Sequence, residues 1–530
     1  MRDKNRVFWY IALPVLIMAV CVLGPMPMQA QMTSTGIDCS QIAALHLLQQ
    51  DNMRAGLALM ECGVVARPVE TAGSGSEAGD EEPVPPNILV SNRTCTSGST
   101  CTKSESFVFH SMKADDHTVV VNYNDHNASQ YSGTSYSTDD GATFTQILPP
   151  PFGTSHSTNY GDPIVIYNQK LSKWVAGDLV AGCGGQGIGL WTSNDGISWT
   201  SGACAHNNSA DDRESMWVDN NPSSAHYGRM YISWNDFNVS GGALFVIHSD
   251  DGNNWTKVQL SSGFFRDVQL TGTPPGVPST TSGGTPAVFV ASMDEGGGGL
   301  ATRQNIMYRS TDGGTTWSSV TMGPRFNPVG DSTCPSNSYF ARINPIWRHM
   351  GWGEPAAGPR GVVHYAYAGK GASENGDIYY VRSRDNGKTW STPIVLNDPG
   401  TGFQTHWMPS VSVNYDATSP VQHGQVTVSW YDRRQATSAC NNVSDPGCNY
   451  QRYGIQSPDN GATWGPNFAI SDTIISEPDQ QDSGVQSCYA GDYDYSTALN
   501  GNAFVTWTDG RVAVSGVHVQ NVEYSAVPEP

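Results

Sequence analysis

The chain has 530 residues, of which 48 are acidic and 28 basic, so its formal net charge is −20. A field of that sign repels phosphate backbones and anionic lipids, which argues against nucleic-acid binding but permits an anionic sugar at a local arginine cluster. Only 14% of the residues are charged, whereas 57 are Gly, 15 are Trp and 22 are Tyr. This composition is typical of many short β-strands joined by turns, with aromatic side chains packed between sheets.

Residues 1–30 have the pattern of an export signal. Three basic residues precede an apolar run from Phe8 to about Gly24, and cleavage is expected after Ala30. The alternative is that the segment stays uncleaved as a membrane anchor; no later segment approaches the ~20 apolar residues that a spanning helix needs. We predict a secreted, periplasmic or extracellular protein.

Ten cysteines follow this signal, and an even number favours disulfides in an exported protein. Sequence proximity predicts the pairs Cys39–Cys62, Cys95–Cys101, Cys183–Cys204 and Cys440–Cys448, which leaves Cys334–Cys488 as a long-range pair. A zinc site is the alternative, but paired Cys-x-x-Cys spacing is absent from the sequence. We expect no metal and no cofactor.

Residues 31–66 are predicted to form a small helical hairpin held by Cys39–Cys62. Asp38 can cap a first helix over residues 39–50, and Asn52 can cap a second helix that Gly63 ends. Residues 67–86 are acidic and rich in Pro, Gly and Ser, without apolar periodicity, which predicts a linker. Residues 87–530 form the remaining domain.

From residue 87 onward a turn motif of the form Ser-x-Asp-x-Gly-x-Thr-Trp recurs. Its Asp can accept hydrogen bonds from turn amides, its Gly supplies a positive φ, and its Trp packs between sheets. Six copies span residues 137–144, 192–199, 248–255, 310–317, 383–390 and 457–464, and in the second and third the aspartate position falls on Asn194 and Asp250. Their glycines lie 55, 56, 62, 73 and 74 residues apart, which is the size of a four-stranded blade.

Two further repeats accompany the turn: a strand that ends in aromatic-x-Asp, and a strand that opens each unit. The opening strands are expected at residues 105–110, 161–167, 213–219, 266–270, 342–347, 406–411 and 491–495. Together the repeats predict an all-β fold, a seven-bladed β-propeller, with six blades as the alternative. The strand Asn87–Ser91 is expected to complete the last blade and close the ring, because closure removes exposed sheet edges.

The six turns and the aromatic-x-Asp strand ends resemble the Asp-box (BNR-repeat) sialidase superfamily over residues 87–527. The resemblance implies a β-propeller with the turns on its rim. In the sialidases of that superfamily it further implies three arginines that grip the substrate carboxylate, a Tyr–Glu nucleophile pair and an Asp acid/base. The Phe-Arg-Ile-Pro motif of those enzymes is absent from this sequence.

The candidate site comes from the unit openings, because the central strands of a propeller present their first residues to the axial channel. We predict Tyr493 as nucleophile, Glu214 as its base and Asp162 as acid/base, with Asp492 or Asp494 as the alternative to Asp162. The predicted substrate-binding residues are Arg213, Arg266, Arg342, Arg433, His406 and Asp492. The alternative for each arginine is a structural ion pair, and for the run 491–495 a set of polar groups around a wet channel.

The favoured interpretation is a secreted sialidase-like glycoside hydrolase acting on acidic glycans. One alternative is a propeller without catalysis that binds glycan or protein on its axial face. Another is a cell-surface scaffold whose N-terminal hairpin docks a protein partner.

Overall fold

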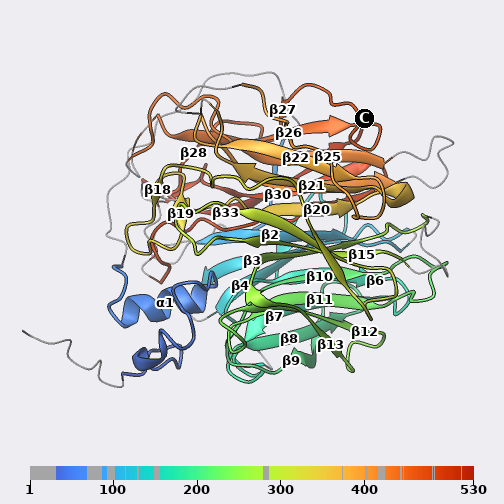
Figure 1. Ribbon diagram of the computed structural model, residues 1–530, viewed down its shortest axis with the longest axis horizontal. Coiled ribbons are helices and arrows are strands. Elements are labelled where there is room, and N and C mark those ends of the chain that lie inside the picture. The colour runs from blue at the N-terminus through green and yellow to red at the C-terminus, as the bar shows by residue number, and fades with distance from the viewer. Residues whose placement is uncertain are drawn as a thin grey trace, which may run out of the picture.

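The computed structural model describes residues 31–67, 86–91, 102–113, 115–127, 130–147, 156–277, 286–345, 347–372, 374–399, 404–415, 424–441, 445, 447–479, 482, 484–514 and 516–530. The predicted signal and most of the predicted linker lie outside these residues. Figure 1 shows the sheets gathered into one body, with the N-terminal segment and its helix at one side. Among the described residues, no helix is long and apolar enough to cross a membrane.

Seven four-stranded antiparallel blades form the body, as predicted, and the six-bladed alternative is not observed. Each innermost strand contacts the innermost strand of the next blade, in the order β2, β6, β10, β14, β20, β24, β29 and back to β2. The strands therefore form a closed ring around an axis.

The first four blades run outward in chain order. Their strands are β2 (Lys103–His110), β3 (Val119–Asn127), β4 (Gln130–Ser137) and β5 (Thr145–Gln146); β6 (Ile164–Asn168), β7 (Lys173–Val180), β8 (Gly187–Ser193) and β9 (Trp199–His206); β10 (Asp211–Val218), β11 (Met230–Asp236), β12 (Ala243–Ser249) and β13 (Thr256–Phe264); and β14 (Arg266–Gly272), β15 (Val288–Asp294), β16 (Gln304–Ser310) and β17 (Ser318–Thr321).

The last three blades complete the circle. Their strands are β20 (Gly353–Ala357), β21 (Val363–Gly369), β22 (Asp377–Ser383) and β23 (Ile394–Val395); β24 (His406–Tyr415), β25 (Gly424–Asp432), β26 (Asn449–Ser457) and β27 (Phe468–Ala469), with β28 (Ile475–Ser476) also on β26; and β29 (Thr497–Leu499), β30 (Asn502–Asp509), β33 (Asn521–Pro528) and β1 (Ile88–Leu89). Short elements outside the blades are η1 (Cys39–Gln41), η4 (Pro359–Gly361) and the pair β31 (Ala513–Val514) and β32 (Val517–His518).

The ring is closed by the N-terminal strand, as the sequence predicts. In β1, Ile88 pairs with Tyr524 and Leu89 with Glu523 of β33, so the outermost strand of the last blade comes from the start of the domain. This pairing covers the backbone edge that β33 would otherwise expose.

The prediction of one opening strand is wrong. Residues 342–347 are not the inner strand of the fifth blade, which is β20 instead. Arg342 belongs to β19 (Ala341–Arg342), which pairs with β18 (Ser332–Thr333) in an insertion between β17 and β20, and Arg342 also forms an isolated bridge with Arg348. The pattern of an arginine followed by apolar residues is typical of an inner strand, but it also fits this insertion, because Trp347 is fully buried there.

The repeated turns connect the third and fourth strands of six blades. In the last copy, Oδ1 of Asp459 accepts hydrogen bonds from the backbone N–H groups of Ala462 and Thr463. The second and third copies are shifted by one residue from the sequence alignment. There the accepting side chains are Asp195 and Asp251, not Asn194 and Asp250, and these turns are one residue shorter.

The N-terminal hairpin, residues 31–66, is less helical than predicted. Asn52 caps α1 (Met53–Glu61) by accepting from the N–H of Ala55, and Gly63 follows the helix at φ +70°. The expected first helix is only the single 3₁₀ turn η1, which Asp38 caps. The remaining residues up to 49 form turns, so packing against the propeller overrides their helical periodicity.

Three of the predicted disulfides are present: Cys39–Cys62, Cys183–Cys204 and Cys440–Cys448. Cys95 and Cys101 lie outside the described residues. The predicted Cys334–Cys488 bond is not formed, because both residues are free, buried thiols. They nevertheless share one apolar cluster, and the thiols contact each other.

Candidate functional site

The inner strands begin with a repeated backbone irregularity. Glu105, Asp162, Arg213, Asp267 and Met408 all have φ between +49° and +70°, a region that side-chain-bearing residues seldom adopt. In β2, β10, β14 and β24 the strand register shifts at the same place. Such bulges redirect side chains at strand ends and occur next to functional sites. Here they accompany charged side chains that gather in the middle of the ring.

Three arginines converge on Asp51 at this end of the axis: two contact its carboxylate and the third its backbone carbonyl. Oδ2 of Asp51 lies 3.1 Å from Nη1 of Arg213 and 2.5 Å from Nη1 of Arg266. Nη2 of Arg348 donates to the backbone carbonyl of Asp51 at 2.7 Å. We call Arg213, Arg266 and Arg348 the arginine pocket. Burial alone would raise the pKa of Asp51, but the three guanidinium charges outweigh it and hold that pKa below its usual range.

Propeller side chains hold each arginine from its other side. Arg213 pairs with Asp267 at 3.2 Å. Arg348 donates to both carboxylate oxygens of Asp492, and Arg266 lies 3.6 Å from Glu295. The guanidinium groups also lie against aromatic rings: Arg213 against Trp352 and Tyr493, and Arg348 against Phe340 and Tyr489. The pocket is therefore built by the propeller itself.

The cluster contains more buried carboxyl groups than arginines. Burial, followed by the charge of Asp51, raises the pKa of Asp162 to about 7. Burial raises the pKa of Asp267 to about 6. Burial and neighbouring acids also raise the pKa values of Glu105, Asp212 and Glu214 well above the ordinary range. The folded state therefore favours the protonated forms of these carboxyl groups more than the unfolded chain does.

The three predicted catalytic residues are all buried in this axial cluster. Arg213 lies 4.8 Å from the ring centre of Tyr493. Burial first, and then the charges of Asp162 and Glu105, raise the pKa of Tyr493 well above its usual value. Within the described part of the chain, no hydrogen bond is formed by the Tyr493 hydroxyl or by either carboxyl oxygen of Glu214. Oδ2 of Asp162 accepts from the backbone N–H of Arg213 at 3.0 Å.

The six predicted binding residues divide into two groups. Arg213, Arg266 and Asp492 meet in the axial cluster, whereas the other three lie elsewhere. Arg342 is half-buried in the insertion and donates to Ser332.

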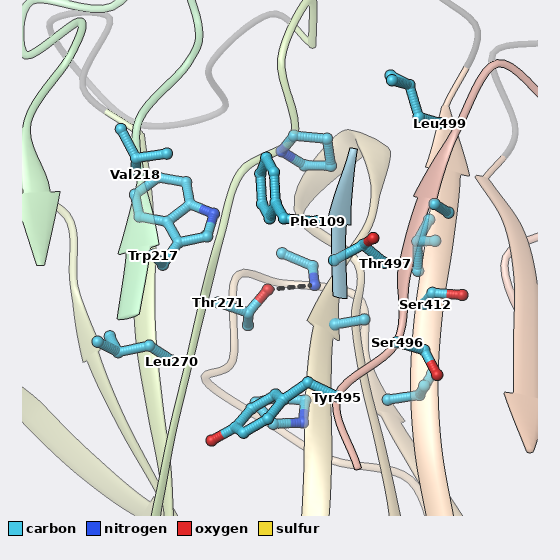
Figure 2. Close-up of a pocket in the computed structure, with 18 of the residues that line it drawn as sticks. Phe109, Trp217, Val218, Leu270, Thr271, Ser412, Tyr495, Ser496, Thr497 and Leu499 are labelled. Carbon is cyan, nitrogen blue, oxygen red and sulfur yellow. Dashed lines mark hydrogen bonds between the residues drawn. The ribbon is translucent and has the colours of Figure 1, made fainter. Parts of the chain in front are cut away.

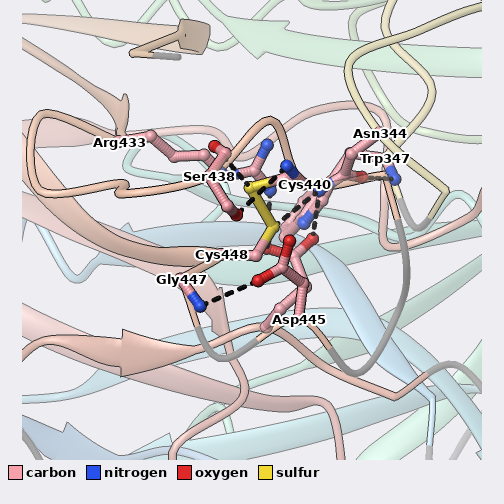
Figure 3. Close-up of a disulfide and its surroundings, with 9 residues drawn as sticks. Asn344, Trp347, Arg433, Ser438, Cys440, Asp445, Gly447 and Cys448 are labelled. Carbon is pink, nitrogen blue, oxygen red and sulfur yellow. Dashed lines mark hydrogen bonds and ion pairs between the residues drawn. A yellow bond between two sulfur atoms is a disulfide. The ribbon is translucent and has the colours of Figure 1, made fainter.

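Arg433 and His406 have structural partners outside the axial cluster. Arg433 pairs with Glu477 at 2.5 Å and lies over the ring of Trp407. Figure 3 shows Arg433 near the Cys440–Cys448 disulfide. His406 is buried 3.2 Å from Asp432, whose charge raises the His406 pKa although burial lowers it. For these two residues the alternative of a structural ion pair describes the observed contacts.

Asp51 is the main residue that sequence reasoning missed. It precedes the predicted cap Asn52, and nothing in the local sequence distinguishes it from a loop residue. Glu105 and Asp212 were also missed as site residues, although both stand at strand openings. Glu105 occupies the position in β2 that corresponds to Asp162, and Asp212 occupies the position in β10 that corresponds to Arg266.

Among the residues that the structure describes, three groups of side chains have the spacing of metal ligands, besides a fourth group that includes the disulfide Cys183–Cys204. They are Asp51, Asp162 and Asp212; His206, Asp211 and Asp236; and Glu374, Asp377 and His406. The first is already compensated by the arginine pocket, and in the second His206 pairs with Asp211 at 2.7 Å. In the third, His406 contacts Asp432. No metal is assigned to these groups.

The opposite end of the axis opens into a cavity of about 180 Å³. Its walls come from six of the seven inner strands, and Figure 2 shows Phe109, Trp217, Leu270 and Tyr495 among the side chains around it. Glu354 lines both this cavity and a much smaller one of about 10 Å³, which Arg213, Asp492 and Tyr493 also line. The apolar cavity thus borders the charged cluster.

The comparisons with known proteins establish no family. No family model and no curated protein matches the chain. Similar solved structures include a protein of unknown function from Dyadobacter fermentans DSM 18053, with 12% identity and a TM-score of 0.37 over 84% of this chain and 99% of that one. The Hadza microbial sialidase Hz136 has 13% identity and a TM-score of 0.38 over 77% of this chain and 76% of that one. The NanB sialidase from Streptococcus pneumoniae has 11% identity and a TM-score of 0.35 over 84% of this chain and 71% of that one. Identities this low and TM-scores below 0.5 do not assign the chain to any of these groups.

Proposed function

We propose that the protein is an exported, sialidase-like glycoside hydrolase that acts on glycans bearing a carboxylate. The observation that carries the proposal is the convergence of three arginines on Asp51. Its carboxylate lies against Arg213 and Arg266, and its backbone carbonyl accepts from Arg348. Guanidinium groups bind carboxylates through charge-assisted hydrogen bonds, and several together select strongly for an acidic sugar.

The proposed roles follow from the groups beside the arginine pocket. Tyr493 attacks the anomeric carbon, and Glu214 takes the phenolic proton. Asp162 donates its proton to the leaving oxygen as the glycosidic bond breaks, which suits a pKa of about 7. Water then attacks the anomeric carbon and gives a proton to Asp162 as the bond between that carbon and the Tyr493 oxygen breaks. Tyr493 recovers its proton from Glu214. A neutral nucleophile avoids repulsion by the substrate carboxylate.

The experiment measures release of a fluorogenic aglycone from a sialoside, a glucuronide and a galactoside by the wild-type chain, Tyr493→Phe and Arg266→Lys. We expect turnover of a carboxylate-bearing substrate only, a loss of at least 100-fold in kcat for Tyr493→Phe, and a rise in KM for Arg266→Lys because the bidentate fork is lost. Unchanged turnover by Tyr493→Phe contradicts the nucleophile assignment. Preference for the galactoside contradicts the proposed function.

A second candidate is glycan binding without catalysis in the apolar cavity. Its aromatic lining, with Phe109 and Trp217 in Figure 2, offers surfaces against which sugar rings stack. In that case a glycan binds with the same affinity to Tyr493→Phe and the wild type, whereas Trp217→Ala weakens it.

A further inference from the structure

The N-terminal hairpin reaches the arginine pocket with its tip. Asp51 and Asn52 lie between η1 and α1, and both are buried. Asn52 donates from Nδ2 to Asp212 at 2.6 Å, and the N–H of Asp51 donates to the same carboxylate at 3.2 Å. The only residue of this tip that carries a charge is therefore placed against the three guanidinium groups.

Each arginine of the pocket also has an acidic neighbour besides Asp51. As described above, Asp267, Asp492 and Glu295 hold the three arginines from the propeller side. Loss of the Asp51 carboxylate would therefore leave Arg213 and Arg266 directed at an empty position, with Arg348 beside them.

Asp51 also uses this pocket incompletely. Its Oδ1 atom is buried and accepts no hydrogen bond from any residue in the described part of the chain, so one of the two oxygens is unsatisfied. A buried acceptor without a partner is costly, and a carboxylate that engages the arginines through both oxygens would bind better.

The rest of the hairpin is attached by polar contacts and one apolar face. Arg54 donates to Gln186 at 2.6 Å and lies over the ring of Tyr160, and Asn337 donates to the carbonyl of Leu48. Met53 and Leu57 are buried in the cluster that also contains Tyr493. The hairpin therefore covers the proposed catalytic groups while Asp51 is bound.

We propose that the hairpin is an autoinhibitory plug and that Asp51 occupies the subsite for the carboxylate of an acidic sugar. The plug and the ligand compete for the same three arginines, and the proposal rests on the proposed function for the identity of that ligand. Displacement of the hairpin admits water to the axial cluster and removes the negative charge of Asp51 from beside Asp162. The states with the hairpin bound and with the hairpin displaced thus differ in the access of solvent and ligand to the axial cluster and in the charge beside Asp162.

The test uses the full chain with Asp51→Asn, Asp51→Ala and, as a matched hairpin control, Glu61→Gln, whose carboxylate binds Ser34 away from the pocket. Binding of free glucuronic acid, N-acetylneuraminic acid and galactose is measured by calorimetry. We expect an acidic sugar to bind both Asp51 variants at least tenfold more tightly than it binds the wild type and Glu61→Gln, with no binding of galactose. Equal affinity in all four proteins, or no binding of either acid, overturns the plug.

Two additional readouts keep the result interpretable. If Asp51→Ala does not fold, Asp51→Asn keeps the shape of the side chain, and hydrogen exchange of residues 53–61 in the wild type reports hairpin release directly. Exchange there should accelerate at saturating acidic sugar, and continued protection with ligand bound contradicts competition. Tight binding of an acidic sugar by the Asp51 variants without turnover contradicts the proposed hydrolase activity but not the autoinhibitory plug. Equal turnover by the wild type and the variants contradicts the plug but not the hydrolase activity.

Discussion

Oδ2 of Asp51 lies 2.5 Å from Nη1 of Arg266, so a carboxylate of the N-terminal hairpin is bound inside the ring of blades. Both side chains are almost fully buried, at 4% and 0% exposure. Because removal of one partner from a buried pair leaves an uncompensated charge, this contact couples the hairpin to the propeller.

That coupling predicts a stability effect. Arg266→Met should lower the free energy of unfolding by about 3–5 kcal/mol, since Asp51 and Glu295 lose their partner. The double variant Asp51→Asn/Arg266→Met should lose less than the sum of the two single variants. Urea unfolding of all four proteins measures the coupling, and strictly additive losses would show that the pair does not interact.

The raised carboxyl pKa values predict a fall in stability at neutral to alkaline pH. Asp162, with a pKa of about 7, and Asp211 and Asp267, each about 6, keep protons in the folded state that the unfolded chain releases near pH 4. Stability from these groups is full below pH 4 and is lost as pH rises through 6 to 7. His349 and His364, with lowered pKa values of about 3, act in the opposite direction, but only between pH 3 and 6.5.

From pH 6.5 to 8 only the carboxyl contribution remains among these groups, so the free energy of unfolding should decrease. Denaturant unfolding at pH 5.5, 6.5 and 8 measures it, and Asp162→Asn should flatten the slope because it removes one of the titrating groups. A rise in stability between pH 6.5 and 8 would contradict this interpretation of the axial cluster.

The shifted turn in the third blade predicts unequal effects at adjacent aspartates. Asp251 accepts from the N–H groups of Asn253 and Asn254, so Asp251→Ala should lower the thermal unfolding temperature more than Asp250→Ala does. Asp250 forms an exposed ion pair with Arg229, and Asp250→Ala should cost at most about 1 kcal/mol. Thermal unfolding of the two variants compares them directly, and a larger loss at Asp250 would restore the alignment made from the sequence.

The Cys39–Cys62 disulfide should stabilise the hairpin more than the blades. It closes a segment with a sequence separation of 23, for which the loss of loop entropy is worth about 3 kcal/mol. Cys39→Ser/Cys62→Ser should therefore accelerate hydrogen exchange in α1 and leave β25 and β30 protected. Uniform loss of protection would show that hairpin and propeller unfold as one unit.

The sequence predicts the propeller well because its information is repeated. Copies of one turn and one strand opening locate Asp162, Arg213 and Asp492 in different blades, and a ring necessarily brings equivalent positions together. Arg342 was misplaced because the insertion before the fifth blade follows no repeat, and its arginine imitates a strand opening.

Asp51 could not be placed from sequence for a related reason. It belongs to a segment without repeats, and its position depends on docking against blades that are distant in sequence. The unsatisfied oxygens of Glu214 and the hydroxyl of Tyr493 likewise arise only from three-dimensional burial.

The pairing of β1 with β33 has a consequence for how the chain acquires its structure. A nascent polypeptide cannot finish the last blade until its C-terminal strand has emerged, because Ile88 must wait for Tyr524. Contacts between segments so far apart in sequence slow folding, and until they form the edge of β33 stays available to other chains. Synthesis that stops before residue 521 should therefore yield aggregates rather than a smaller functional ring.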